Sequence, residues 1–139
     1  MKTGCFKQVN DGQTNGYISI SLYPSKNDFV NYEYKSLAPN WKLFENLNQK
    51  KITEDQFIKL YKEQLFLLNA NTVYEDLKSL VTGFEPIIMT NVSKKKFCHR
   101  HIVAEWLENE LGIVIEEYKV GTVTRSNGYM KKNTNPTLF

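Results

Sequence analysis

The alternation of apolar and polar side chains predicts the strands of this chain. In the run GYISISLYP, residues 16–24, isoleucines alternate with serines as far as Ser21, and Pro24 closes the run as a turn would. Residues 87–89, IIM, are apolar without alternation, which is typical of a strand covered on both faces. The run IVIEEYKV, residues 113–120, reads as a further strand.

Helical periodicity predicts two helices after the first of these strands. The first, in residues 40–48, is short and carries a single apolar stripe. The second, in residues 53–68, begins with a capping box in which Thr53 is the cap and Gln56 stands three residues later. Residues 25–41, rich in Asn, Ser, Pro and aromatics, indicate a structured loop rather than a flexible linker.

Two more helices follow by the same criteria. The third, in residues 72–83, repeats the capping box with Thr72 and Glu75, and its last residue is a glycine where a C-terminal cap belongs. The fourth begins near Cys98, carries a long apolar stripe and ends at Gly112.

The order of these elements predicts an α/β fold. Strand, helices, strand, helix and strand in succession imply right-handed crossovers in a mostly parallel sheet flanked by helices. We expect one compact ligand-binding domain over residues 1–120 and an irregular C-terminal tail over residues 121–139. The Asn127-Gly128 pair in this tail is a hairpin-turn signal for a small ribbon, and an oligomer contact is the alternative use of the tail. The final residues are expected to be disordered.

Composition narrows the class of protein. A chain of 139 residues fits one domain, and it has no 18-residue apolar run that could span a bilayer. Eighteen basic residues against 15 acidic ones leave little for a phosphate-tracking stripe, so duplex nucleic acid is unsupported as a partner. The N-terminus lacks a signal-peptide pattern, which favours the cytoplasm. Cys5, in an expected first strand, and Cys98 have no C-x-x-C spacing, so two free thiols are expected.

The candidate chemistry lies in the run KKKFCHRH, residues 94–101, directly before the fourth helix. Ligands of open parallel sheets bind beyond the carboxyl ends of the strands, where helices begin with unpaired N–H groups and partial positive charge. Arg100 adds a fork of donors suited to phosphate or carboxylate, so an anion is the expected ligand. The expected ligand-binding residues are Ser21, Tyr23, Tyr34, Lys35, Asn91, Cys98, His99 and Arg100.

Other uses of this run stay open. The field that attracts an anion would also stabilise a thiolate at Cys98. The alternative is a structural cysteine that packs as a small hydrophobic side chain. Cys98, His101 and Glu105 share a helix face, yet no partner helix supplies further ligands, so neither a metal nor another cofactor is expected. His101 and Glu105 read as an exposed i, i+4 pair. Lysines 94–96 are either a funnel over the site or a solvated loop.

A family resemblance rests on four segments in order: YISISLYP, YEYKSLAPNWKLF, ITEDQFIKLYKEQL and IIMTNVSKKKFCHRHIVAEWL. From about Tyr17 to Tyr118 the chain resembles the bacterial and phage family called domain of unknown function 488. The resemblance implies a compact α/β domain with the Cys-His-Arg turn, Cys98 to Arg100, at the edge of a shared cleft. It implies a functional role for these residues without supplying a reaction.

The chain also departs from that family. Relatives commonly carry a cysteine and an acid at the end of the strand before the Cys-His-Arg turn, and an arginine at the end of the first strand. Here these places read MTNV and ISLYP. The departures argue against a two-cysteine mechanism and leave Asn91, Ser21 and Tyr23 as neutral hydrogen-bonding substitutes.

Three functional hypotheses follow. The leading one is a module that binds, and in a phage setting sequesters, a phosphate-bearing, nucleotide-derived molecule in the host cytoplasm. The second is a transferase or hydrolase with Cys98 as its nucleophile and a histidine as proton carrier. The third is an interaction protein that acts through residues 121–139.

Overall fold

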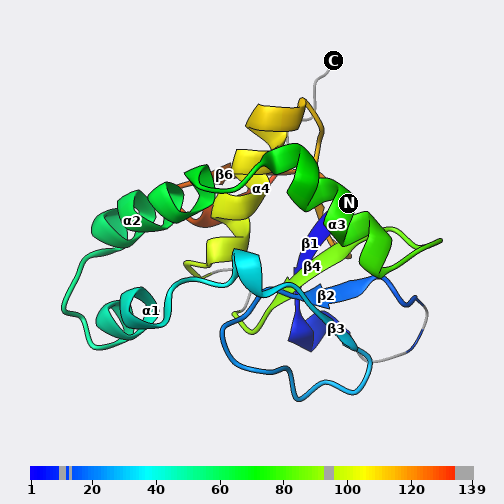
Figure 1. Ribbon diagram of the computed structural model, residues 1–139, viewed down its shortest axis with the longest axis horizontal. Coiled ribbons are helices and arrows are strands. Elements are labelled where there is room, and N and C mark those ends of the chain that lie inside the picture. The colour runs from blue at the N-terminus through cyan, green and yellow to red at the C-terminus, as the bar shows by residue number, and fades with distance from the viewer. Residues whose placement is uncertain (10–11, 13, 93–95, 134–139) are drawn as a thin grey trace.

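A five-stranded sheet in which every pairing is parallel forms the centre of the protein (Figure 1). The computed structural model of the chain describes residues 1–9, 12, 14–92 and 96–133. Across the sheet the strands are β3 (Tyr32–Glu33), β2 (Tyr17–Ser19), β4 (Ile87–Thr90), β1 (Lys2–Cys5) and β5 (Glu116–Glu117). The predicted α/β class with its parallel sheet is therefore confirmed.

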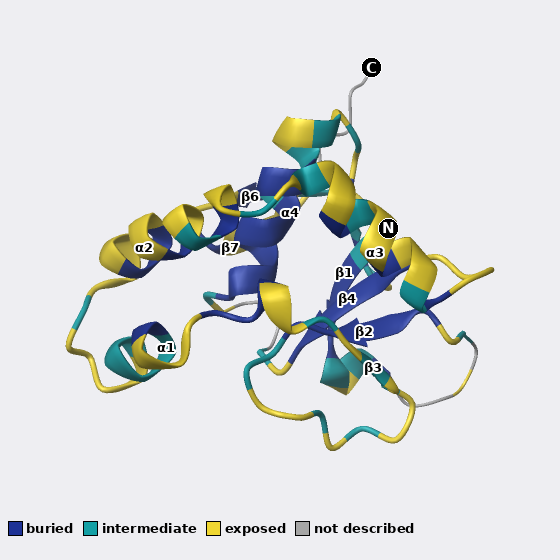
Figure 2. Ribbon diagram, viewed as in Figure 1, coloured by how far each residue is buried: buried dark blue, intermediate teal, exposed yellow. Residues whose placement is uncertain are grey.

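The helices gather on one face of this sheet. They are α1 (Trp41–Asn48), α2 (Glu54–Phe66), α3 (Ala70–Leu80) and α4 (His99–Leu111). Ile18 and Ile88 of the sheet share one buried core with residues from all four helices. Tyr17, Ile87 and Met89 point to the other face, which the 3-10 helix η1 (Phe6–Gln8) and neighbouring loops cover. The first half of α4 is buried on all sides, as Figure 2 shows.

Most helix ends follow the local signals in the sequence. The capping box of Thr53 and Gln56 is present, because the Thr53 hydroxyl accepts from the Gln56 amide N–H and the Gln56 side chain accepts from the Thr53 amide. The start of α3 was predicted wrongly at Thr72. The helix begins at Ala70, because the Asn69 side chain accepts from the Thr72 amide and caps it first.

The strands are shorter than their patterns predict. In residues 16–24 the pairing stops at Ser19, whose hydroxyl accepts from the Ser21 amide and holds a local turn. In residues 113–120 only Glu116 and Glu117 pair with β1, since Lys119 adopts a φ of 63° and reverses the chain. The structured loop predicted over residues 25–41 contains β3 and a second 3-10 helix, η2 (Lys35–Leu37), which the sequence did not reveal.

A hairpin follows the sheet. Strands β6 (Val123–Ser126) and β7 (Tyr129–Lys132) pair antiparallel around the Asn127-Gly128 turn, as expected for a small ribbon, and β6 packs against α4. The expected disorder falls on residues 134–139, which lie outside the described part of the chain. Within the described residues, none of the helices has the length and apolar composition needed to cross a membrane.

Candidate functional site

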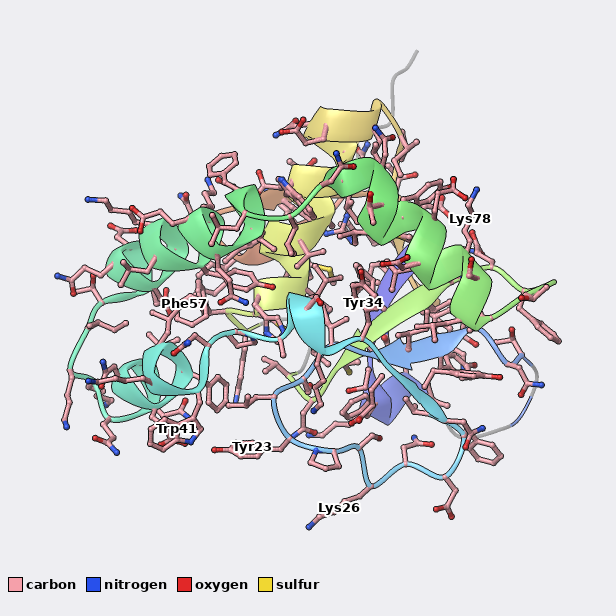
Figure 3. All side chains as sticks on the ribbon, viewed as in Figure 1. Tyr23, Lys26, Tyr34, Trp41, Phe57 and Lys78 are labelled. Carbon is pink, nitrogen blue, oxygen red and sulfur yellow. The ribbon has the colours of Figure 1, made fainter. Side chains whose placement is uncertain are left out.

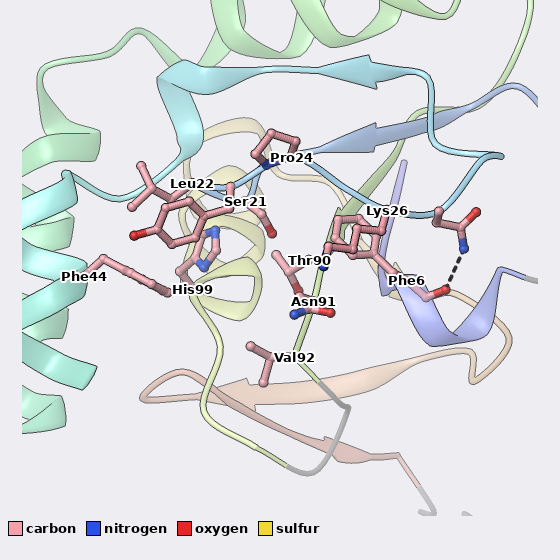
Figure 4. A pocket seen from close by; sticks show the side chains of 12 residues that line it. Phe6, Ser21, Leu22, Pro24, Lys26, Phe44, Thr90, Asn91, Val92 and His99 are labelled. Atoms are coloured by element: carbon pink, nitrogen blue, oxygen red, sulfur yellow. Dashed lines mark hydrogen bonds between the residues drawn. The ribbon is translucent and has the colours of Figure 1, made fainter. Parts of the chain in front are cut away.

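A cavity of about 400 Å³ opens at the carboxyl edge of the parallel sheet (Figure 4). Its walls come from the segments that follow β1, β2 and β4, together with the starts of α1 and α4. Its lining mixes aromatic and apolar side chains with hydroxyl, amide, imidazole and ammonium groups. The lining residues are Phe6, Ser21, Leu22, Tyr23, Pro24, Lys26, Asn27, Phe44, Thr90, Asn91, Val92 and His99.

Four of the eight predicted ligand-binding residues line this cavity: Ser21, Tyr23, Asn91 and His99. Tyr23 is half exposed at its rim, where its hydroxyl donates to Glu45 at 2.7 Å and its ring meets Phe44 edge-on. The sequence did not single out Phe6, Phe44 or Lys26, because these side chains come from separate segments with no shared motif. Lys26 is the one cationic side chain among the described lining residues.

Tyr34 and Lys35 lie outside the cavity lining. Tyr34 is labelled in Figure 3. Its hydroxyl donates to Asp76 of α3 at 2.6 Å. Burial and this hydrogen bond raise the pKa of Tyr34 to about 12. The Lys35 ammonium donates to the carbonyl oxygens of Ser21 and Leu22 at 3.2 and 2.8 Å. Both side chains therefore hold the rim segment and the helices in place rather than facing a guest.

Arg100 differs most from its expected role. Its side chain is fully buried, and its guanidinium donates to the Glu117 carboxylate at 2.8 Å and to the Val92 carbonyl at 2.7 Å. A further N–H donates to the Thr90 hydroxyl at 2.9 Å. The charge of Arg100 is thus matched by a carboxylate inside the protein, so an anion in the cavity does not meet this side chain directly.

Cys98 lies behind the cavity wall, 2% exposed, as the N-cap residue of α4. Its Sγ lies 3.0 Å from the Thr90 hydroxyl oxygen. Because that oxygen already accepts from Arg100, the single hydroxyl hydrogen of Thr90 is available to point at the sulfur. Burial raises the pKa of Cys98, but a hydrogen bond and charge from His99, the charge of Arg100 and the Thr90 hydroxyl together lower it from 9.0 to about 7.

His99 connects this thiol to the cavity. Its Nε2 lies 2.9 Å from the Ile20 carbonyl oxygen, which can only accept, so Nε2 carries a hydrogen. In the neutral ring Nδ1 is then the acceptor nitrogen. The ring packs edge-on against Tyr61, whose hydroxyl donates to the Leu37 carbonyl at 2.6 Å. The orientation and tautomer of His99 are therefore set by groups outside the cavity.

His101 is not the exposed partner of Glu105 that its spacing predicts. It is fully buried, and its Nδ1 accepts from the Arg125 guanidinium of β6 at 3.2 Å. Burial, with the charges of Arg100, Arg125 and His99, lowers the pKa of His101 to about 2. The prediction of an exposed His101–Glu105 pair was wrong because the β6–β7 hairpin covers the face of α4 on which His101 lies. A neutral, buried His101 cannot serve as proton carrier for Cys98.

A buried ionic cluster extends behind the site. Arg125 donates to the Ile115 carbonyl and to the Thr3 hydroxyl, and Thr3 in turn donates to Glu117 at 2.6 Å. Two buried guanidinium groups, Arg100 and Arg125, thus surround one buried carboxylate. The excess positive charge favours an anion nearby, and the charge of Arg100 is one of the causes that lower the pKa of Cys98.

The described residues contain no group of three or more metal-ligating side chains. Cys5 and Cys98 are both free thiols, as predicted. Of the lysine run, Lys94 and Lys95 fall outside the described residues, so the choice between a funnel and a solvated loop stays a prediction.

Fold and site together define a small α/β domain that carries a Cys-His pair beside a cavity at the carboxyl edge of its sheet. The chain belongs to the domain of unknown function 488 family: the family model described as the active DUF488-N3 subclade, DUF488-N3a, matches residues 18–111. This confirms the expected family. No curated protein and no solved structure matches the chain. The match includes the lining residues from Ser21 to His99, and the β6–β7 hairpin lies beyond it.

Proposed function

We propose that the protein binds a small nucleotide-derived molecule with one phosphate group in the cavity at the sheet edge. The observation that carries this proposal is the make-up of the cavity, which combines aromatic rings with hydrogen-bonding groups and a single lysine. Cavities of this size and mixed lining are typical of small-molecule sites. By analogy, a phage-encoded protein that sequesters a host signalling nucleotide is the setting we propose for such binding.

The lining residues divide into three roles. Phe6 and Phe44 present ring surfaces on which a base can pack. Ser21 and Asn91 supply polar contacts, whereas the Asn27 amide already donates to the Phe6 and Val9 carbonyls. Lys26 supplies the positive charge that the sequence had assigned to Arg100. One exposed lysine fits one phosphate better than a polyphosphate chain.

Titration with ribonucleoside monophosphates tests this proposal. We expect each to raise the thermal unfolding midpoint, with the matching nucleosides weaker and inorganic phosphate weakest, because base and phosphate occupy different parts of the cavity. Lys26→Ala should weaken monophosphate binding about tenfold, which corresponds to about 1.4 kcal/mol, and leave nucleoside binding unchanged. Isothermal titration calorimetry measures both.

Lys59→Ala is the matched control. Lys59 is exposed on α2 and does not line the cavity, so this variant has the same net charge as Lys26→Ala and should bind like the unaltered protein. Equal losses in both variants would mean that only net charge matters. An absence of any monophosphate effect at millimolar concentration would refute the proposal.

The geometry around Cys98 favours a second candidate, a cysteine-dependent transferase or hydrolase. A thiol with a pKa of about 7 beside His99 is a competent nucleophile near neutral pH. With p-nitrophenyl acetate, the thiolate would attack the carbonyl carbon, expel p-nitrophenolate and keep the acetyl group as a thioester until water hydrolyses it.

Mass spectrometry and absorbance test this second function. We expect an acetyl group on Cys98 and steady release of p-nitrophenolate, both lost in Cys98→Ser, while monophosphate binding is unchanged. Cys5→Ser is the control, because Cys5 is the other free thiol of the chain, at the end of β1, and has no place in the Cys98–His99 pair. Equal release by Cys98→Ser and the unaltered protein would exclude Cys98 as the nucleophile.

A further inference from the structure

The tip of the β6–β7 hairpin touches the start of α4 at the candidate site. The Gly128 carbonyl accepts a hydrogen bond from the Cys98 amide at 2.8 Å. This bond fixes the backbone of the residue whose side chain meets Thr90. The hairpin is not part of the segment, residues 18–111, that the family model matches.

The fit of the tip is close. Gly128 has a φ of +82° and is buried, and a Cβ added there would lie 2.3 Å from Cε1 of Phe97. The Phe97 ring in turn packs edge-on against Phe57 of α2 and Tyr129 of β7, with centroid distances of 5.5 and 5.7 Å. The residue directly before Cys98 is therefore held between the hairpin and α2.

The hairpin is itself anchored at two points. On β6, Arg125 reaches Thr3 of β1 and the Ile115 carbonyl before β5. On β7, the Tyr129 hydroxyl donates to the Glu54 carboxylate at the start of α2, at 2.8 and 2.9 Å. Because both strands are hydrogen-bonded to the rest of the domain, the tip of the hairpin has a fixed position and can hold the backbone of Cys98 in place.

We propose that the β6–β7 hairpin is a positioning element of the candidate site, with Gly128 holding the Phe97–Cys98 backbone so that Sγ of Cys98 faces the Thr90 hydroxyl. The hairpin does not touch the guest, and it acts only through Cys98. The inference rests on the proposed function in one respect, since it takes the Cys98–His99 end of the cavity as part of the working site.

Gly128→Ala tests the hairpin, with Gly121→Ala as its matched control. Both glycines have positive φ, +82° and +101°, so both variants carry backbone strain, but nothing lies within 4 Å of a Cβ at Gly121. The readout is the rate of Cys98 alkylation by iodoacetamide between pH 5 and 10, followed on the Cys98 peptide by mass spectrometry. The charged and titratable groups around the thiol, His99, Arg100 and Tyr61, are unchanged in both.

We expect the alkylation midpoint of Gly128→Ala to rise by at least one pH unit, because the sulfur loses its alignment with His99 as well as with Thr90, while Gly121→Ala keeps the midpoint of the unaltered protein. Phe97→Ala removes the ring between hairpin and α2 and should shift the midpoint in the same direction. If Gly128→Ala does not fold, Phe97→Ala decides the matter alone. A folded variant at either position with an unshifted midpoint overturns the proposal.

The same variants separate this inference from the proposed function. Failure of the unaltered protein to bind ribonucleoside monophosphates would remove the proposed ligand and leave the alkylation midpoints as a direct test of the hairpin. Conversely, unshifted midpoints in a protein that binds monophosphates would limit the hairpin to a structural role.

Discussion

Replacing Glu117 by alanine should lower the free energy of unfolding by about 3–5 kcal/mol, the usual cost of removing one partner of a buried ion pair. The Glu117 side chain is fully buried, and its carboxylate accepts from Arg100 at 2.8 Å and from Thr3 at 2.6 Å. Without it, Arg100 and Arg125 remain buried with no carboxylate between them. Urea unfolding followed by circular dichroism measures the change.

Glu116→Ala is the control for this loss. Glu116 lies on the same strand but is half-buried. Its carboxylate accepts a long hydrogen bond of 3.4 Å from the Thr122 hydroxyl. A loss below about 1 kcal/mol is expected there, as for an ordinary surface charge. If both variants lost the same amount, the buried cluster would contribute nothing specific to stability.

Local signals in the sequence were enough for much of the framework. The apolar run before Thr90, the Thr53 capping box and the glycine at position 112, with a φ of 66°, all follow from interactions within a few residues. The cavity lies at the carboxyl edge of the sheet, the edge at which the sequence predicts the candidate site, because parallel sheets bring their strand ends together.

The orientation of Arg100 could not be predicted in the same way. Its partner Glu117 lies 17 positions later in a run where two glutamates follow each other, and the pattern does not say which one faces inward. Only the pairing of β5 with β1, which sets Thr3 beside Glu117, turns that carboxylate into the core. Sheet register is a tertiary property. The sequence pattern therefore contains no sign that Arg100 pairs with Glu117 instead of binding a ligand.

The surroundings of His101 show a related limit. A helix at the surface would leave one face of α4 to solvent, and the exposed His101–Glu105 pair predicted from the sequence requires such a face. The hairpin covers this face instead, and Arg125 reaches His101 across it. The Asn127-Gly128 turn signalled the hairpin but not where it packs, since packing depends on residues far apart in the chain.

Replacing Thr90 by valine should raise the pKa of Cys98 part of the way from about 7 to its ordinary value of 9.0, because the hydroxyl that faces the sulfur is lost while the side-chain shape, His99 and Arg100 are kept. A rise of one pH unit in this pKa would reduce the thiolate fraction at pH 7 about fivefold. The rate of Cys98 alkylation by iodoacetamide at pH 7 should fall accordingly, and the midpoint of its pH profile should rise.

Thr90→Ser restores the hydroxyl and should restore most of the reactivity, which a purely structural role of Thr90 would not require.

The lowered pKa of Cys98 should also make the free energy of unfolding depend on pH. A thiol whose folded pKa lies below its unfolded pKa stabilises the protein fully above pH 9, and this stabilisation is lost as the pH falls toward 7. Unfolding free energies of the unaltered protein should therefore rise between pH 7 and 9 more steeply than those of Thr90→Val or Cys98→Ser. Parallel curves for all three proteins, together with an unchanged alkylation midpoint in Thr90→Val, would show that the Thr90 hydroxyl does not set the charge of Cys98.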